Sequence, residues 1–172
     1  MDNEEIENLC LQIKELKDHF LGVFPCDMLP KRNEINSTKF CIANLDPSYM
    51  DGSHWVALIY RPYPKKDVYF DSYGRPPPLE IERRLKKDYK RNKIQLQHSF
   101  STACGQWCIF FCCALFSNHA LKKISDFFDR QSDLLVNDYI VNNFVNSILT
   151  DDNIYKVIDR KFLKKQFAIA LK

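Results

Sequence analysis

A run of ten apolar residues, from Trp107 to Phe116, constrains the fold of this chain more than any other segment. It lies within a longer stretch, Gly105 to Ser117, that is apolar on every side of a helix, which is typical of a helix buried in a protein core. The run is much shorter than the roughly 20 apolar residues that a membrane span requires. The sequence therefore predicts a core helix and no membrane segment.

The rest of the chain has the composition of a globular domain. Its 172 residues are 45% hydrophobic and 27% charged, which excludes a disordered or low-complexity chain. With only four glycines there is little room for a flexible linker. We expect a single monomeric domain over residues 1–172. Because the acidic N-terminus has no apolar signal core, we do not expect secretion.

Hydrophobic periodicity predicts helices and short strands in an α+β layout. Besides the core helix, helices are expected over residues 4–20, 79–92, 134–149 and 154–170. Strands are expected at Phe40–Asn44, Trp55–Tyr60, Val68–Phe70 and Ile94–Gln97, and a loop at Phe24–Pro30.

The second and third of these strands flank a turn-rich segment, which predicts an antiparallel hairpin. With the turn centred just after Pro62, Leu58 pairs with Asp67, and His54 faces Asp71 at a Cβ separation of about 5 Å. A carboxylate at that distance can accept the imidazole N–H and fix its tautomer. Such a pair can have a structural role as well as a catalytic one.

A cysteine opens the core helix. Cys104 follows the small residues 101–103, so the sequence places its thiol at a helix N-terminus, where free backbone N–H groups and the helix dipole lower the pKa of a thiol. A thiolate beside an imidazolium that a carboxylate orients can carry out acyl transfer. Taken alone, Cys104 is equally consistent with a buried structural cysteine.

The other cysteines indicate neither a disulfide framework nor a zinc site. The chain has seven, an odd number. Cys104, Cys108 and Cys112 are one helical turn apart and spread over about 12 Å. Three such sulfurs cannot converge on one zinc ion with Zn–S distances of about 2.3 Å. We expect Cys108, Cys112 and Cys113 in the core, and no metal.

Acyl transfer also requires a donor for the negative charge that develops on the carbonyl oxygen. Gln97 lies at the end of the strand predicted before Cys104, and its side-chain amide can form this oxyanion hole together with the backbone N–H of Cys104. Gln95 is the weaker candidate. For either glutamine the alternative is an ordinary surface position.

Positive charge is concentrated in two segments. Glu80–Lys93 contains seven lysines and arginines against three acids, and Lys156–Lys172 contains six against Asp159 alone. Both segments are consistent with solvated helix faces or with a surface that binds a polyanion.

The motifs around these candidates resemble the adenain family, the maturation proteases of adenoviruses, which have relatives in virophages and Polinton-type elements. The resemblance rests on Gly52–Trp55 around the histidine, Tyr69–Gly74 around the acid, and Gln97 with Ala103–Gly105 around the cysteine. The order histidine, acid, glutamine, cysteine is that of the family. The similarity extends over residues 18–117.

This resemblance implies a papain-like α+β fold of the adenain and SUMO-protease type, with a central mixed sheet flanked by helices. It implies a cysteine endopeptidase in which His54 is the general base, Asp71 orients it, Cys104 is the nucleophile and Gln97 is the oxyanion donor. Substrates would be capsid and core precursor proteins, cut after Gly-Gly or Gly-X in the virion or at the host-cell assembly site. No cofactor is implied except DNA as a stimulator, which segment 80–93 could bind.

Two features depart from the adenoviral pattern. The acid is Asp71, where the adenoviral enzymes have Glu and relatives that remove SUMO-like modifiers have Asp. The interval from Asp71 to Cys104 is shorter and contains no cysteine, which argues against disulfide attachment of an activating peptide. Two alternatives stay open: a deconjugating protease for a ubiquitin-like modifier, and an inactive relative that binds DNA or capsid.

Overall fold

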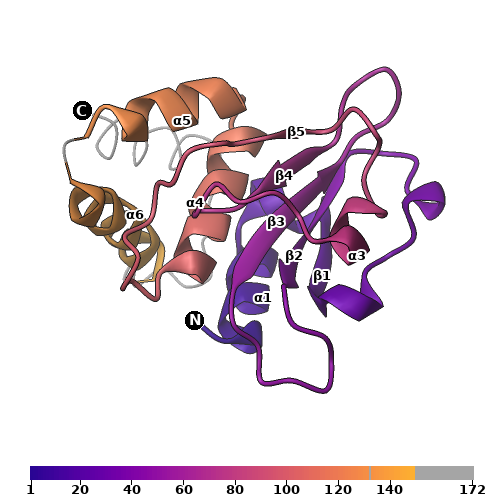
Figure 1. The fold of residues 1–172 in the computed structure, drawn as a ribbon, viewed down its shortest axis with the longest axis horizontal. Helices are drawn as coiled ribbons and strands as arrows, with labels where there is room; N and C mark the ends of the chain where they lie inside the picture. Colours follow the sequence, from indigo (N-terminus) through magenta and orange to yellow (C-terminus); the bar gives the residue numbers. More distant parts are fainter. Residues whose placement is uncertain (132, 150–172) are drawn as a thin grey trace.

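The described part of the chain, residues 1–131 and 133–149 of a computed structural model, contains a five-stranded sheet (Figure 1). The strands, in spatial order, are β1 (Phe20–Pro25), β2 (Lys39–Asn44), β3 (Trp55–Tyr60), β4 (Val68–Phe70) and β5 (Lys90–Arg91). β3 is antiparallel to β2 and β4, whereas β1 is parallel to β2 and β5 is parallel to β4. The sheet is therefore mixed, and β2, β3 and β4 confirm three of the predicted strands.

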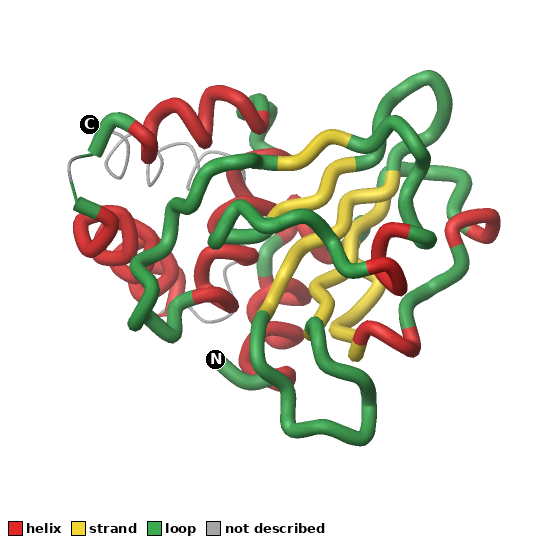
Figure 2. The backbone as a smooth tube through the Cα atoms, viewed as in Figure 1, coloured by secondary structure: helices red, strands yellow, loops and turns green. Residues whose placement is uncertain are grey.

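Helices lie on both faces of this sheet (Figure 2). They are α1 (Asn3–Gln12), α2 (Lys14–Lys17), α3 (Leu79–Glu82), α4 (Cys104–Phe116), α5 (Leu121–Asp129) and α6 (Leu134–Leu149), with short 3-10 turns η1 (Cys26–Met28) and η2 (Arg32–Glu34). α4 confirms the predicted core helix, because it contacts β3 as well as α1, α2, α5 and α6. No helix of the described residues is long and apolar enough to span a membrane.

The N-terminal helix ends earlier than predicted. α1 stops at Gln12, one further turn follows, and residues 20–25 form the edge strand β1 instead of a helix end and a loop. The pairing of β1 with β2 is irregular between Phe20 and Val23. An edge strand tolerates proline and irregular pairing, so Gly22 and Pro25 lie within β1 and not at a helix end and in a loop.

The helix predicted over residues 79–92 is wrong beyond its first turn. The buried carboxylate of Asp67 accepts the backbone N–H of Lys86 at 3.0 Å, and the Asp67 carbonyl accepts the backbone N–H of Lys90 at 2.9 Å. These bonds draw the segment alongside β4 and end the helix. The predicted helix would have faced inward with Ile81, Leu85 and Tyr89; Ile81 and Leu85 are buried, and Tyr89 is half-buried.

Residues 94–97 are not a strand. The backbone N–H groups of Leu96 and Gln97 both donate to the carbonyl of Ser72, at 2.8 and 3.1 Å, instead of pairing with a neighbouring strand.

The C-terminal helices were predicted in part. α5 was not predicted, and α6 confirms the helix at 134–149. The helix predicted at 154–170 lies outside the described residues, and the single domain over 1–172 stays a prediction.

The β3–β4 hairpin forms in a register that differs from the prediction by two residues. Leu58 pairs with Tyr69 rather than with Asp67, because the turn is centred one residue later. A shift of two residues leaves every side chain on its predicted face of the sheet. His54 and Asp71 therefore stay on one face, as diagonal instead of directly opposed neighbours.

Candidate active site

His54 lies at the start of β3, where a loop returns from the end of β2. The side-chain Oδ1 of Asn44 accepts the backbone N–H groups of Asp46 and Ser53 at 3.0 and 3.1 Å. The carbonyl of His54 accepts the N–H of Leu45 at 3.0 Å. These bonds close the loop at its base and fix the backbone at His54, whose side chain is buried.

Asp71 directly follows β4 and is fully buried. Its Oδ1 lies 2.6 Å from Nε2 of His54 and accepts the N–H of Tyr73 at 2.9 Å. The side-chain amide of Asn92 holds the Asp71 backbone, because it accepts the Asp71 N–H at 3.1 Å and donates to the Asp71 carbonyl. The structure thus brings the predicted histidine and acid together.

Cys104 is the first residue of α4, as predicted. The side chain of His54 and the backbone N–H groups of Trp55 and Gly105 all lower the pKa of its thiol. Because Asp71 occupies Nε2 of His54, the ring nitrogen left for Cys104 is Nδ1. The imidazole of His54 is therefore bonded to the carboxylate of Asp71 and coupled electrostatically to the thiol of Cys104.

The pKa values of His54 and Cys104 shift in opposite directions. Burial lowers the pKa of His54, but the hydrogen bonds with Asp71 and Cys104 outweigh it and raise the pKa from 6.5 to about 9. Burial raises the pKa of Cys104, but the bonds from His54, Trp55 and Gly105 bring it below its ordinary value of 9.0. The site therefore favours a thiolate–imidazolium pair, the form that a nucleophilic cysteine requires.

Gln97 is fully buried, and both ends of its amide are held. Oε1 accepts the hydroxyl of Ser72 at 2.6 Å, and Nε2 donates to the carbonyl of Ser101 at 2.8 Å. An amide nitrogen carries two N–H groups, so the bond to Ser101 uses only one. Gln95, the weaker candidate, is exposed and donates to the Gln97 carbonyl and to Ser99.

Sequence reasoning missed two residues at this site. The ring of Tyr73 stacks on His54 with centroids 4.8 Å apart, and its hydroxyl donates to the carbonyl of Ser101 at 3.3 Å. The correct hairpin register would have indicated Tyr73, because it places this residue opposite His54. Asn92 carried no local signal, since it reaches Asp71 from a segment that was predicted to be helical.

The other cysteines do not contribute to this site. All seven are free thiols. Cys108, Cys112 and Cys113 lie in the core as predicted, and burial raises the pKa of each. Within residues 1–131 and 133–149, no group of three or more His, Cys, Asp or Glu side chains is arranged to hold a metal ion.

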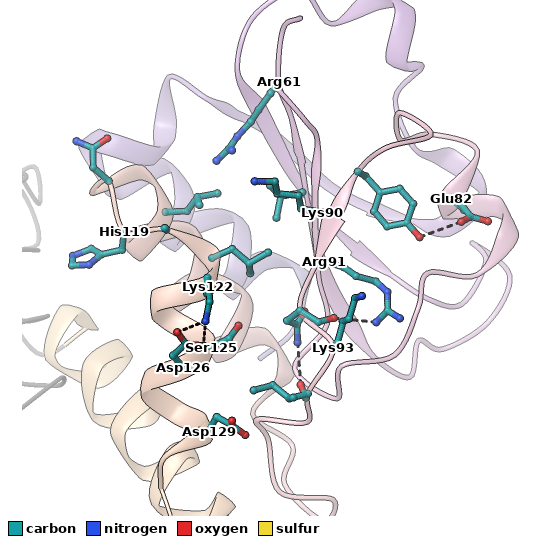
Figure 3. A pocket seen from close by; sticks show the side chains of 18 of the residues that line it. Arg61, Glu82, Lys90, Arg91, Lys93, His119, Lys122, Ser125, Asp126 and Asp129 are labelled. Atoms are coloured by element: carbon teal, nitrogen blue, oxygen red, sulfur yellow. Dashed lines mark hydrogen bonds and ion pairs between the residues drawn. The ribbon is translucent and has the colours of Figure 1, made fainter. Parts of the chain in front are cut away.

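A basic groove, of about 1080 Å³, lies between β5 and the start of α5 (Figure 3). Three acidic residues line it together with six basic ones, namely Arg61, Lys87, Lys90, Arg91, Lys93 and Lys122. Lys122 is paired with Asp126 at 2.7 Å, whereas Lys87, Lys90 and Lys93 make no ion pair with another described residue. The lining of the groove extends from Leu115, near the C-terminal end of α4 and about 17 Å along the helix from Cys104, to Asn92, whose side chain holds Asp71.

No family model matches the chain. Over an alignment of 111 residues it is 30% identical to a protein named protease of bovine adenovirus 4, covering 54% of this chain and 54% of that relative. The chain thus spans about half the length of the curated relative that it matches. This similarity confirms the resemblance to the adenovirus proteases that the motifs predicted.

The fold is similar to that of a protease of African swine fever virus. Its crystal structure matches with a TM-score of 0.55 and 23% sequence identity, over 80% of this chain and 64% of that one. At 23% sequence identity this match is evidence about the fold alone. It confirms the papain-like α+β fold of the adenain and SUMO-protease type, in which helices flank a mixed sheet.

Proposed function

We propose that this chain is a cysteine endopeptidase with Cys104, His54, Asp71 and Gln97 as its catalytic residues. The observation that carries the proposal is the series from Asp71 through His54 to Cys104, with 2.6 Å between the carboxylate and the ring and a lowered pKa at the thiol. The similarity to an adenovirus protease and the fold of a second viral protease support the same class of enzyme.

In the proposed reaction the thiolate of Cys104 attacks the scissile carbonyl carbon, and negative charge develops on the carbonyl oxygen. That oxygen accepts hydrogen bonds from the backbone N–H of Cys104 and the amide of Gln97. Each of these bonds lowers the activation free energy by about 3 kcal/mol. As the C–N bond breaks, His54 gives its Nδ1 proton to the leaving amine. Water then attacks the thioester while His54 takes its proton, which releases the acid and restores the thiolate–imidazolium pair.

We further propose that the substrates are capsid and core precursor proteins, cut after small residues such as Gly-Gly or Gly-X at the site of virion assembly. The preference for glycine rests on the size of the Trp55 side chain, which directly follows His54 in the sequence and would narrow the approach to the nucleophile. Cleavage should therefore slow when Ala or Val replaces the glycine before the scissile bond. An unchanged rate across that peptide series would refute this substrate preference.

Mass-spectrometric mapping of cleavage sites in a peptide library tests the activity. Wild type and the control Cys26→Ala, which removes a thiol in η1, should cut after Gly-Gly or Gly-X, and Cys104→Ala should not cut. Cuts that persist in Cys104→Ala would contradict the proposal. Cleavage restricted to conjugates of a ubiquitin-like modifier would instead identify a deconjugating protease.

We also propose that DNA stimulates the reaction by binding in the basic groove, where Lys87, Lys90 and Lys93 are unpaired among the described residues. The double variant Lys90→Glu/Lys93→Glu should keep the basal rate and lose the stimulation, since both lysines line the groove and neither belongs to the candidate active site. The matched control, Lys14→Glu/Lys17→Glu on α2, should behave as wild type. DNA binding should weaken as salt is added, and a wild-type rate that DNA does not change would contradict this proposal.

A further inference from the structure

We infer that Asp138 of α6 is a positioning residue that fixes the nucleophile helix relative to the segment carrying Gln97; this inference rests on the proposed function. Asp138 is 5% exposed, and its two carboxylate oxygens bind different parts of the molecule. Oδ1 accepts the indole N–H of Trp107 at 2.7 Å, and Oδ2 accepts the backbone N–H of His98 at 3.1 Å.

The first of these bonds connects Asp138 to the nucleophile helix. Trp107 lies in the first turn of α4 with Cys104, and its backbone N–H donates to the carbonyl of Ala103 at 2.9 Å. Its fully buried ring packs edge-on against Phe128 and Phe110, with centroids 4.7 and 6.3 Å apart. The indole cannot turn without repacking the core, so its bond to Asp138 fixes α6 relative to this first turn.

The second bond connects Asp138 to the oxyanion donor, since His98 directly follows Gln97. The neighbouring residue on α6, Asn137, donates from its side chain to the carbonyl of Leu96 at 3.0 Å. α6 therefore holds the backbone on both sides of Gln97. Because residues 94–97 belong to no strand, these bonds replace the ladder that would otherwise fix such a segment.

A carboxylate suits this position because it offers two acceptor oxygens and no donor. The change Asp138→Asn keeps one acceptor oxygen and replaces the other with an NH₂ group. This NH₂ group would face either the indole N–H of Trp107 or the backbone N–H of His98, so two donors would meet. Either Trp107 or His98 then has a buried donor without a partner, which is unfavourable. We expect the segment with Gln97 to move away, and a displacement of about 1 Å can reduce the rate about 100-fold.

The test compares peptide hydrolysis with alkylation of Cys104 by iodoacetamide, which depends on the Cys104–His54 pair but needs no oxyanion hole. For Asp138→Asn we expect kcat to fall between about 10-fold and 100-fold, with KM and the pH profile of alkylation unchanged. The matched control Asp88→Asn, at an exposed carboxylate paired with Lys66, should behave as wild type.

Equal kcat values for Asp138→Asn and wild type would overturn the inference and leave the proposed function intact. A parallel loss of hydrolysis and alkylation would also overturn it, because that pattern indicates general disruption of the fold. Absence of hydrolysis by the wild type would overturn both. If Asp138→Asn does not fold, Asp138→Glu, which keeps two acceptors on a longer side chain, should give the same split between hydrolysis and alkylation.

Discussion

The two halves of the candidate site are held by different kinds of structure. The ladder-held half, His54 and Asp71, lies at the ends of paired strands and beside Asn92. The loop-held half, Gln97 and its segment, has no ladder and depends on side chains from Ser72 and α6. We expect changes in the ladder-held half to alter the reactivity of the thiol, and changes in the loop-held half to alter only stabilisation of the oxyanion.

Replacing the histidine should have the largest effect on the ladder-held half. In His54→Ala we expect kcat to fall by at least about 10⁴-fold. Alkylation near neutral pH should slow as well, because without His54 the pKa of Cys104 rises. Steady-state hydrolysis and iodoacetamide alkylation measure the two effects, with His119→Ala at the far end of α4 as control. Unchanged alkylation in His54→Ala would show that the ring does not activate the thiol.

The pH dependence of the wild type should separate the reactivity of the Cys104 thiolate from proton donation by His54. Hydrolysis needs the thiolate and the His54 proton together, so it should fall at low pH and fall again as pH rises through about 9, where His54 loses its proton. Alkylation needs the thiolate alone and should stay high above that pH. Hydrolysis that continues to increase above pH 9 would contradict the role of His54 as the acid for the leaving amine.

Removing the amide of Gln97 should affect the loop-held half alone. We expect Gln97→Ala to lower kcat by about 100-fold, the effect of one lost oxyanion donor, and to leave alkylation of Cys104 unchanged. Gln95→Ala, at the exposed glutamine two residues earlier, is the matched control and should be neutral. If Gln95→Ala caused the larger loss, the assignment of the oxyanion donor would be wrong.

The same division explains what could be predicted from the sequence. Local periodicity predicted β3, β4 and α4; His54 directly precedes β3, Asp71 directly follows β4, and Cys104 begins α4. A register error of two residues did no harm, because it preserved the face of each side chain. The segment between β4 and α4 was predicted poorly, since bonds from distant residues determine its path. Asn92 and Asp138 act across the fold, so neither had a local signal.

The two halves meet at Gly74, where a side chain should be costly. Gly74 has φ of 69°, and a Cβ there would lie 2.4 Å from the backbone carbonyl oxygen of Ile94. We expect Gly74→Ala to reduce the free energy of unfolding by about 2 kcal/mol, measured by urea denaturation. Gly74→Asn, which tolerates this φ but meets the same carbonyl, should be destabilised too. If Gly74→Asn were as stable as the wild type, the positive φ, and not the contact with Ile94, would explain the loss of stability in Gly74→Ala.

The smallest expected effect comes from the hydroxyl of Tyr73, which joins the two halves through the carbonyl of Ser101. Tyr73→Phe keeps the ring stacked on His54 and removes one hydrogen bond, worth about 1 kcal/mol or roughly a fivefold change. We expect a loss of that size in kcat and none in alkylation. Tyr89→Phe, whose hydroxyl donates to the exposed Glu82, is the matched control. If Tyr73→Phe slowed alkylation as much as hydrolysis, the hydroxyl would act on the thiol through His54, and the two halves would not be separable.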